Sequence, residues 1–252
     1  MDNTYPLRAA LFHDATPVLP RPGFAFRRTG RKIIFIGFNK TATSSLAMLM
    51  MASGILTIHS SGNGKLFGRP EAEQATIPHA TRHIKANLDA QRPPLHGLEG
   101  YDVFIDLTVG PHDLNLRFAE FHAAYPDALF ILNTRSVQGW LASRRAHKKL
   151  VQITAKYLVL RPWQVLEKWR NDFATHHANA RTYFARNAPD QFFEWPVSAP
   201  PEQLATFFAR HDIPLAPSLY FHIRETGGLF LPPPLKAIAH PTEIPILPSN
   251  QP

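Results

Sequence analysis

The stretch FIGFNKTATSSLAML, from Phe35 to Leu49, carries one lysine and several hydroxyl groups directly after an apolar run. Lys40 supplies a full positive charge, and hydrogen-bond donors come from Thr41, Thr43, Ser44 and Ser45. Backbone N–H groups at the start of the following helix would add partial positive charge, so the turn is suited to bind an anion. The common phosphate loop, G-x-x-x-x-G-K-[ST], has its lysine near the end, whereas Lys40 comes only three residues after Gly37. A plain helix cap beside a solvated lysine is the alternative interpretation.

A second stretch, FILNTRSVQGWLAS, places Arg135 directly after another apolar run. Ser143 follows eight residues later, a little over two turns along the next expected helix. This separation can bring both side chains to one anion, to which the guanidinium would make a charge-assisted hydrogen bond. The alternative is an ordinary ion pair at Arg135 and a serine on a solvated helix face.

Together the two stretches resemble the sulfotransferase family, and in particular its broad bacterial group. FIGFNKTATSSL resembles the 5′-phosphosulfate loop of that family, in which a strand leads into a K-x-G-T-[TS] turn, and FILNTRSVQGWLAS resembles its 3′-phosphate motif. YDVFIDLT, WRNDFATHHANARTYFARNAPDQFFEWPV and LATFFARHDIP extend the similarity over roughly residues 31–224. The resemblance implies a P-loop NTPase-like α/β fold. It also implies transfer of a sulfuryl group from 3′-phosphoadenosine 5′-phosphosulfate (PAPS), which leaves the 3′,5′-bisphosphate PAP.

The resemblance assigns roles to individual residues. It implies that Lys40 contacts the bridging oxygen that gains charge as the S–O bond breaks, which would stabilise the transition state electrostatically. The 5′-phosphate would be held by Thr41, Ala42, Thr43 and Ser44. The 3′-phosphate would be held by Arg135 and Ser143, and a late segment, FHIRETGGLF, offers Arg224 for closing over it. No metal ion is required in this scheme.

Ala42 departs from the family pattern, which usually has glycine at that position. If the position requires positive φ, alanine costs on the order of 1 kcal/mol or more. The consequence would be an adjusted loop, a lower affinity, or a descendant that binds without catalysis.

Attack by an acceptor hydroxyl requires a general base. By the resemblance, Asp106 at the end of YDVFID is the first candidate, and His112 is the reserve. A buried structural aspartate and a surface histidine are the alternatives. Weaker candidates are His59 and the pair His176–His177. The pair is not expected to bind a metal ion either, because adjacent residues of a helix do not face the same side.

The elements that must position these residues alternate between strands and helices. Strands are expected at residues 33–37, 101–106 and 128–135 and in QFFEWPV. Helices are expected at about residues 43–53 and 162–186, and in LNLRFAEFHAAYP, SVQGWLASRRAHKKL and EQLATFFARHDIP. The alternation predicts one α/β domain with a central parallel sheet flanked by helices, and ligands bind at the carboxyl ends of such strands. Residues 57–100 give weak helical hints only near residues 80–88 and are expected to cover the site. Trp163 and Trp169 are expected in the core.

Three parts are expected: an irregular lead-in at residues 1–30, the α/β domain at residues 31–229, and a proline-rich tail at residues 230–252. A hydrophobic content of 44% without cysteine predicts a globular protein that has no disulfide framework. The N-terminus lacks a signal-peptide pattern, and the longest apolar run is too short to span a bilayer, so a cytoplasmic protein is expected.

The net charge is +8, which nucleic acid, an anionic membrane or a small anionic ligand could each explain. The chain lacks zinc-finger spacing and an RNA-binding aromatic signature, so a dedicated nucleic-acid module is not expected. The resemblance to sulfotransferases implies a PAPS-dependent enzyme with a small-molecule, glycan or lipid acceptor. The alternatives are an ATP-dependent small-molecule kinase, or a non-catalytic nucleotide-binding or interaction protein on the same fold.

Overall fold

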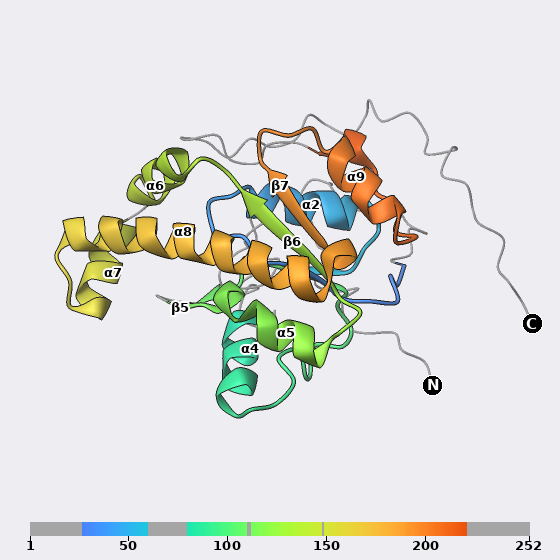
Figure 1. Ribbon diagram of the computed structural model, residues 1–252, viewed down its shortest axis with the longest axis horizontal. Helices are drawn as coiled ribbons and strands as arrows, with labels where there is room; N and C mark the ends of the chain where they lie inside the picture. The colour runs from blue at the N-terminus through green and yellow to red at the C-terminus, as the bar shows by residue number, and fades with distance from the viewer. Residues whose placement is uncertain (1–26, 60–79, 110–111, 148, 221–252) are drawn as a thin grey trace, which may run out of the picture.

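A five-stranded parallel sheet forms the centre of the computed structural model, which describes residues 27–59, 80–109, 112–147 and 149–220 (Figure 1). Its strands are β1 (Ile33–Phe35), β2 (Thr57–His59), β3 (Val103–Ile105), β6 (Leu129–Thr134) and β7 (Phe192–Pro196). They pair in parallel in the order β2-β3-β1-β6-β7. The predicted α/β fold with a central parallel sheet is confirmed. Most of the expected lead-in, the proline-rich tail and Arg224 lie outside the described residues.

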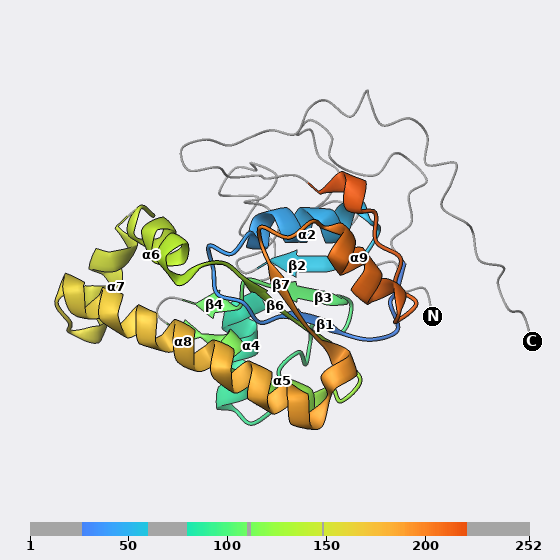
Figure 2. The ribbon, with the colours of Figure 1, turned by 45° about the horizontal axis from the view of Figure 1, so that its top comes forward.

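Helices cover both faces of the sheet (Figure 2). One face carries α2 (Thr43–Ala52) and α9 (Glu202–Ala209), and the other carries α4 (Ala80–Asp89), α5 (Phe118–Ala124) and α8 (Pro162–Asn187). The alternation of side chains along β1 explains the two layers. Ile33 and Phe35 pack in the hydrophobic cluster with α2 and α9, whereas Ile34 packs in the cluster with α4, α5 and α8. Each face of the strand is therefore sealed by its own set of helices.

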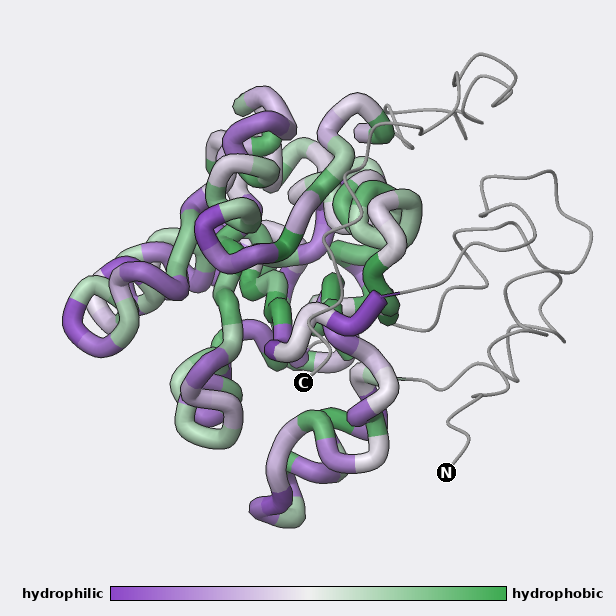
Figure 3. Tube along the Cα trace, turned by 90° about the vertical axis from the view of Figure 1, so that its right-hand side faces the viewer, coloured by the Kyte–Doolittle hydropathy of each residue, from purple (hydrophilic) through white to green (hydrophobic). Residues whose placement is uncertain are grey.

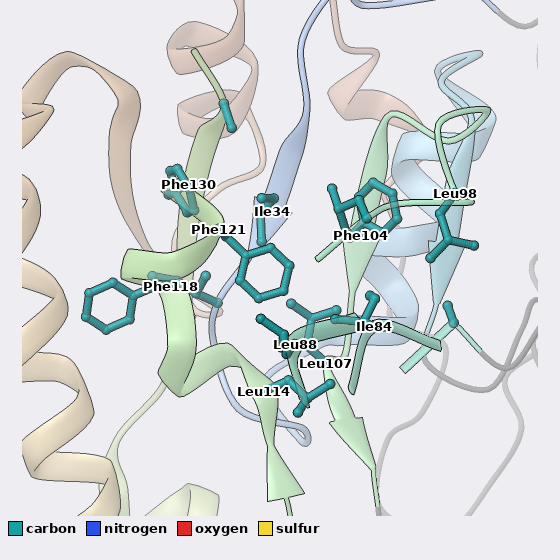
Figure 4. Packing of buried hydrophobic residues seen from close by; sticks show 14 of the residues in the cluster. Ile34, Ile84, Leu88, Leu98, Phe104, Leu107, Leu114, Phe118, Phe121 and Phe130 are labelled. Carbon is teal, nitrogen blue, oxygen red and sulfur yellow. The ribbon is translucent and has the colours of Figure 1, made fainter. Parts of the chain in front are cut away.

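The central strand β6, with the sequence LFILNT, is buried along its whole length. Such a continuous apolar run is typical of a strand covered on both faces of a parallel sheet. Figure 3 shows the apolar segments gathered in the middle of the molecule and hydrophilic segments on the outer helices and loops. In Figure 4, Phe118 and Phe121 of α5 pack beside Ile34 and Phe130, and Ile84 of α4 packs near Phe104.

A third cluster lies beyond the carboxyl ends of the strands, where α6 (Val137–Arg145) and α7 (Leu150–Leu158) pack on the first half of α8 (Figure 1). Phe38, from the loop after β1, joins this cluster with its ring centroid 5.0 Å from that of Trp140. The loop after β1 is thus anchored in a hydrophobic core of its own.

Several elements differ from the sequence-based expectation. The strand β2 was not expected, because three residues are too few to show an alternating pattern. The weak helical hint near residues 80–88 is confirmed by α4. The helix expected over SVQGWLASRRAHKKL ends at Arg145, and α7 begins a separate helix. Trp169 is buried as expected, but Trp163 is 57% exposed, so its expected place in the core was wrong.

The short elements are β4 (Thr108–Val109), β5 (His112–Asp113), η2 (Leu114–Arg117), η3 (Pro189–Gln191) and η4 (Pro217–Leu219). In the described part of the chain, no helix is long and apolar enough to cross a membrane.

Two buried histidines of α8 tie this helix to the ends of β1 and β6. The Nε2 atom of His176 donates to the carbonyl oxygen of Ile36 at 2.7 Å, and that of His177 lies 2.7 Å from the hydroxyl of Thr134. Burial lowers the pKa of His176 to about 4 and also lowers the pKa of His177. The folded protein therefore keeps the ring of His176 neutral at pH values where the unfolded chain would protonate it.

We expect the free energy of unfolding to fall on acidification, because the folded pKa of His176 lies below its unfolded value of 6.5. The stability is complete above pH 6.5 and is lost as the pH falls toward 4, with a loss of about 3 kcal/mol for a shift of this size. Urea unfolding between neutral pH and about pH 4.5 measures it. His176→Gln, which can still donate to Ile36, should flatten the pH dependence. The exposed control His96→Gln should not, and an unchanged slope in His176→Gln would contradict the assignment.

Candidate functional site

The loop between β1 and α2 contains two residues in the left-handed conformation. Lys40 has φ 69° and Ala42 has φ 61°, while Thr41 between them has negative φ. When residues of alternating handedness follow each other, successive backbone N–H groups can turn toward one side and form a concavity that binds anions. Position 42 therefore has a positive φ, and its alanine occupies a conformation that glycine adopts at lower cost.

Asn133 of β6 holds this loop. Its buried side chain accepts a hydrogen bond from the backbone N–H of Gly37 (3.0 Å) and donates to the carbonyl and hydroxyl oxygens of Thr41 (2.9 and 2.7 Å). The backbones approach so closely that a Cβ on Gly37 would lie 2.0 Å from the carbonyl oxygen of Asn133. Asn133 was not among the predicted site residues, although a polar residue directly after the apolar run LFIL was a signal.

The hydroxyl of Thr41 is used within the loop. It receives the hydrogen bond from Asn133 and donates to the carbonyl oxygen of Phe38, and the residue is fully buried. Its contribution to a ligand is therefore left to its backbone N–H group. Of the other predicted residues, Thr43 is buried in the first turn of α2, and Ser44 is half-buried beside it.

The two stretches singled out in the sequence meet in space. Arg135 donates from Nη1 to the carbonyl oxygen of Lys40 at 3.3 Å, and the indole N–H of Trp140 donates to the carbonyl oxygen of Asn39 at 2.9 Å. The Nζ atom of Lys40 lies 3.4 Å from Nδ1 of His147, in the connection that follows α6. One lysine and one arginine thus gather at the carboxyl ends of the adjacent strands β1 and β6.

The helix α6 is fixed by an arginine beside Ser143. The guanidinium of Arg144 packs on two tryptophan rings, with its Cζ atom 4.8 Å from the ring centroid of Trp140 and 4.2 Å from that of Trp169. Burial lowers the pKa of Arg144. Burial also raises the pKa of Asp113, and the positive charge of Arg144 partly offsets that increase. Because Arg144 points inward, Ser143 takes a half-buried place on the neighbouring side of the helix.

A second group of polar side chains lies at the ends of β2 and β3. The Nε2 atom of His59 lies 3.3 Å from the hydroxyl of Thr43 and 3.5 Å from Oδ2 of Asp106. Asp106 has φ 62°, and left-handed non-glycine residues concentrate at functional sites. The pairing of His59 with Ile105 explains the meeting, because it sets His59 beside the residue that precedes Asp106. Sequence analysis rated His59 as a weak candidate, since the only local signal was a histidine that closes the run ILTIH.

The remaining predicted residues are placed elsewhere or are not described. His112 lies in β5, where its exposed ring contacts Tyr157 of α7 with Nε2 3.3 Å from the phenolic oxygen. Arg224 lies outside the described residues.

The start of α2 lacks its own compensation for the positive end of the helix. Ala42 occupies the N-cap without a side-chain hydrogen bond, and the first turn contains no acidic residue. The first N–H groups of a helix have no intrahelical partner. An anion in the concavity of the loop would therefore meet both the field of the helix and the charge of Lys40.

A comparison with family models gives one match over this part of the chain. A model described as a sulfotransferase domain matches residues 32–212, which include every element from β1 to α9. A comparison with curated proteins found no match.

We expect Ala42→Gly to stabilise the protein by about 0.5–1 kcal/mol. Relief of the left-handed strain at an L-residue, about 1–2 kcal/mol, exceeds the entropy that glycine adds to the unfolded chain. Ala47→Gly is the matched control, because Ala47 is buried inside the same helix; it should destabilise by about 1 kcal/mol or more. Urea unfolding of both variants measures the difference. Equal destabilisation in the two would mean that position 42 is not left-handed in solution.

Proposed function

Because the chain belongs to the sulfotransferase family, we propose that it transfers a sulfuryl group from PAPS to a hydroxyl or amine acceptor and leaves PAP. Family membership supports sulfuryl transfer in general. The observation that supports the choice of donor is the contact between Arg135 and Lys40. It joins a loop suited to one phosphate and an arginine suited to another, as a 3′,5′-substituted nucleotide requires.

The residues present fit this donor. PAPS, when bound, supplies an activated sulfuryl group on its 5′-phosphate and carries a separate 3′-phosphate. The loop N–H groups around the left-handed Lys40 and Ala42, together with the start of α2, would hold the 5′ end. Arg135 and Ser143 would hold the 3′-phosphate, since a guanidinium binds phosphate in a bidentate manner.

Lys40 would stabilise the negative charge that develops on the leaving oxygen. Its ammonium group already lies at the mouth of the loop, next to Nδ1 of His147. That nitrogen must accept the hydrogen bond, so the contact requires His147 without a proton on Nδ1. A preorganised cation of this kind acts without moving during the reaction.

His59 and Asp106 would remove the proton of the acceptor as a pair. The proton would pass from the acceptor O–H or N–H to His59 or Asp106, which lie 3.5 Å apart (Nε2 to Oδ2). The link from His59 to Thr43 connects this pair to the first turn of α2. The expected base Asp106 thus gains a partner at the carboxyl end of the adjacent strand.

The proposal is tested first by calorimetric titration of the full chain with PAP, AMP, and ATP with magnesium. We expect selective binding of PAP with a dissociation constant on the order of micromolar. Preference for ATP would favour a kinase, and binding of none of the three would favour a non-catalytic interaction protein.

Arg135→Ala should weaken PAP binding by about 10- to 100-fold, the value of a hydrogen bond to a charged group, and AMP binding by much less. The reason is that only PAP carries a 3′-phosphate. Arg145→Ala, at the exposed end of α6, is the control and should leave both affinities unchanged. Equal weakening of PAP and AMP in Arg135→Ala would contradict the 3′-phosphate assignment.

Asp106→Asn and His59→Gln should each lower the rate of PAP release from PAPS by about 10²- to 10⁴-fold, and PAP should still bind. The rate is measured with a panel of phenol, sugar and amine acceptors. His96→Gln, on an exposed loop, serves as the control. Turnover that survives in both variants but disappears in His112→Gln would move the base to His112.

A further inference from the structure

Exposed apolar side chains are concentrated in one segment of the described chain. Among the described residues, five large hydrophobic side chains are exposed, and four of them lie within eleven residues of each other. These four are Ile153 (59% exposed), Tyr157 (58%), Val159 (91%) and Trp163 (57%), and we refer to them as the α7 face. Scattered exposed apolar residues are normal, but a cluster of them marks an interaction site.

The packing of α7 separates its inner and outer sides. Val151, Thr154 and Ala155 are buried toward the neighbouring helices. Lys149, Ile153, Lys156 and Tyr157 point outward with the spacing i, i+4, i+7 and i+8, so they share one side of the helix. Exposed cationic side chains therefore lie beside Ile153 and Tyr157 of the α7 face.

The turn between α7 and α8 continues this face. Val159 ends α7 with φ 54°, a left-handed conformation that is a marked outlier for a β-branched residue. The hydrogen bond from the N–H of Leu160 to the carbonyl oxygen of Ala155 closes the turn. The strained turn leaves Val159 almost wholly exposed directly before Trp163 in the first turn of α8. α7 and the start of α8 lie together at one end of the molecule (Figures 1 and 2).

The charge along the segment that carries the α7 face is mainly positive. Residues 128–166 contain seven Lys or Arg and no Asp or Glu; the seven are Arg135, Arg144, Arg145, Lys148, Lys149, Lys156 and Arg161. Of these, Arg145, Lys149, Lys156 and Arg161 are exposed. The first acidic residue that follows is Glu167, one turn beyond Trp163 on α8. Exposed cations thus accompany the apolar side chains along the whole face.

We propose that the α7 face binds the surface of an anionic lipid bilayer. Tryptophan and tyrosine suit the boundary between headgroups and acyl chains, and Ile153 and Val159 would enter the apolar layer beside them. Lys and Arg side chains near an anionic bilayer are attracted by its negative surface potential. This mode of binding involves no membrane-spanning helix and does not depend on the proposed reaction.

The charge pattern disfavours a second copy of the chain on this face. A twofold-symmetric dimer pairs the same surface patch of both copies. The cations Lys149, Lys156 and Arg161 would then face a second patch that is itself mainly cationic, in which Glu167 is the one nearby acidic residue along the chain. Nucleic acid would match the charge but would not bury Ile153 and Val159.

The test is flotation of the full-length protein with phosphatidylcholine vesicles that contain or lack phosphatidylglycerol. We expect binding to the anionic vesicles that weakens with added salt. Ile153→Ser combined with Trp163→Ser should weaken binding at least tenfold, because both apolar side chains would be buried in the bilayer. Lys156→Glu combined with Arg161→Glu should weaken it at least as much. All four side chains are exposed, so the fold should be retained.

Arg186→Glu combined with Arg210→Glu is the matched control, because it changes the net charge by the same amount. Arg186 lies in the last turn of α8, about 37 Å along the helix from Arg161, and Arg210 follows α9 on the other face of the sheet. Vesicle binding should survive in this variant. Equal loss in the control and in Lys156→Glu/Arg161→Glu would overturn the proposal, and so would binding that both test variants retain. Absence of vesicle binding, with a wild-type dimer that Ile153→Ser dissociates, would assign the face to self-association instead.

Discussion

The side chain of Asn133 crosses from β6 to the loop after β1 and satisfies polar groups at both ends of that loop. Its oxygen accepts from Gly37, and its nitrogen donates to Thr41, in a place where none of these groups reaches water. Loss of such a buried hydrogen bond leaves an unsatisfied polar group, which costs about 1–3 kcal/mol. The amide of Asn133 therefore sets the path of the loop, and every candidate ligand at the carboxyl end of β1 depends on it.

The loop needs this support because its conformation is strained. Lys40 and Ala42 are both left-handed, at a cost of about 1–2 kcal/mol for each residue. Buried side chains from other elements compensate: Trp140 donates to Asn39, and Asn115 and His176 both donate to the carbonyl oxygen of Ile36. Strain that persists only because its surroundings enforce it is characteristic of functional sites. The same holds for Asp106, the left-handed residue at the end of β3.

Much of the fold follows from local patterns. The buried strands β1, β3 and β6 are continuous apolar runs, and α2 and α8 show helical periodicity, so each could be predicted from its own residues. The positive φ at Ala42 could be anticipated because glycine was the expected residue there. The position of His59 could not, because it depends on the pairing of β2 with β3, two strands separated by more than forty residues. Trp163 shows a further limit: periodicity assigns a residue to a side of a helix, but only the tertiary structure decides whether that side is covered.

The helices between β6 and β7 connect the candidate site with the α7 face. On the inside, Trp140 and Trp169 enclose Arg144 and receive Phe38 from the loop, so these helices hold the candidate site in place. On the outside, α7 turns its uncovered side chains to the surroundings. The connection between α6 and α7 belongs to both, because His147 contacts Lys40 there. Binding of α7 to a charged surface would therefore take place close to His147, which contacts Lys40, the lysine on which the proposed chemistry depends.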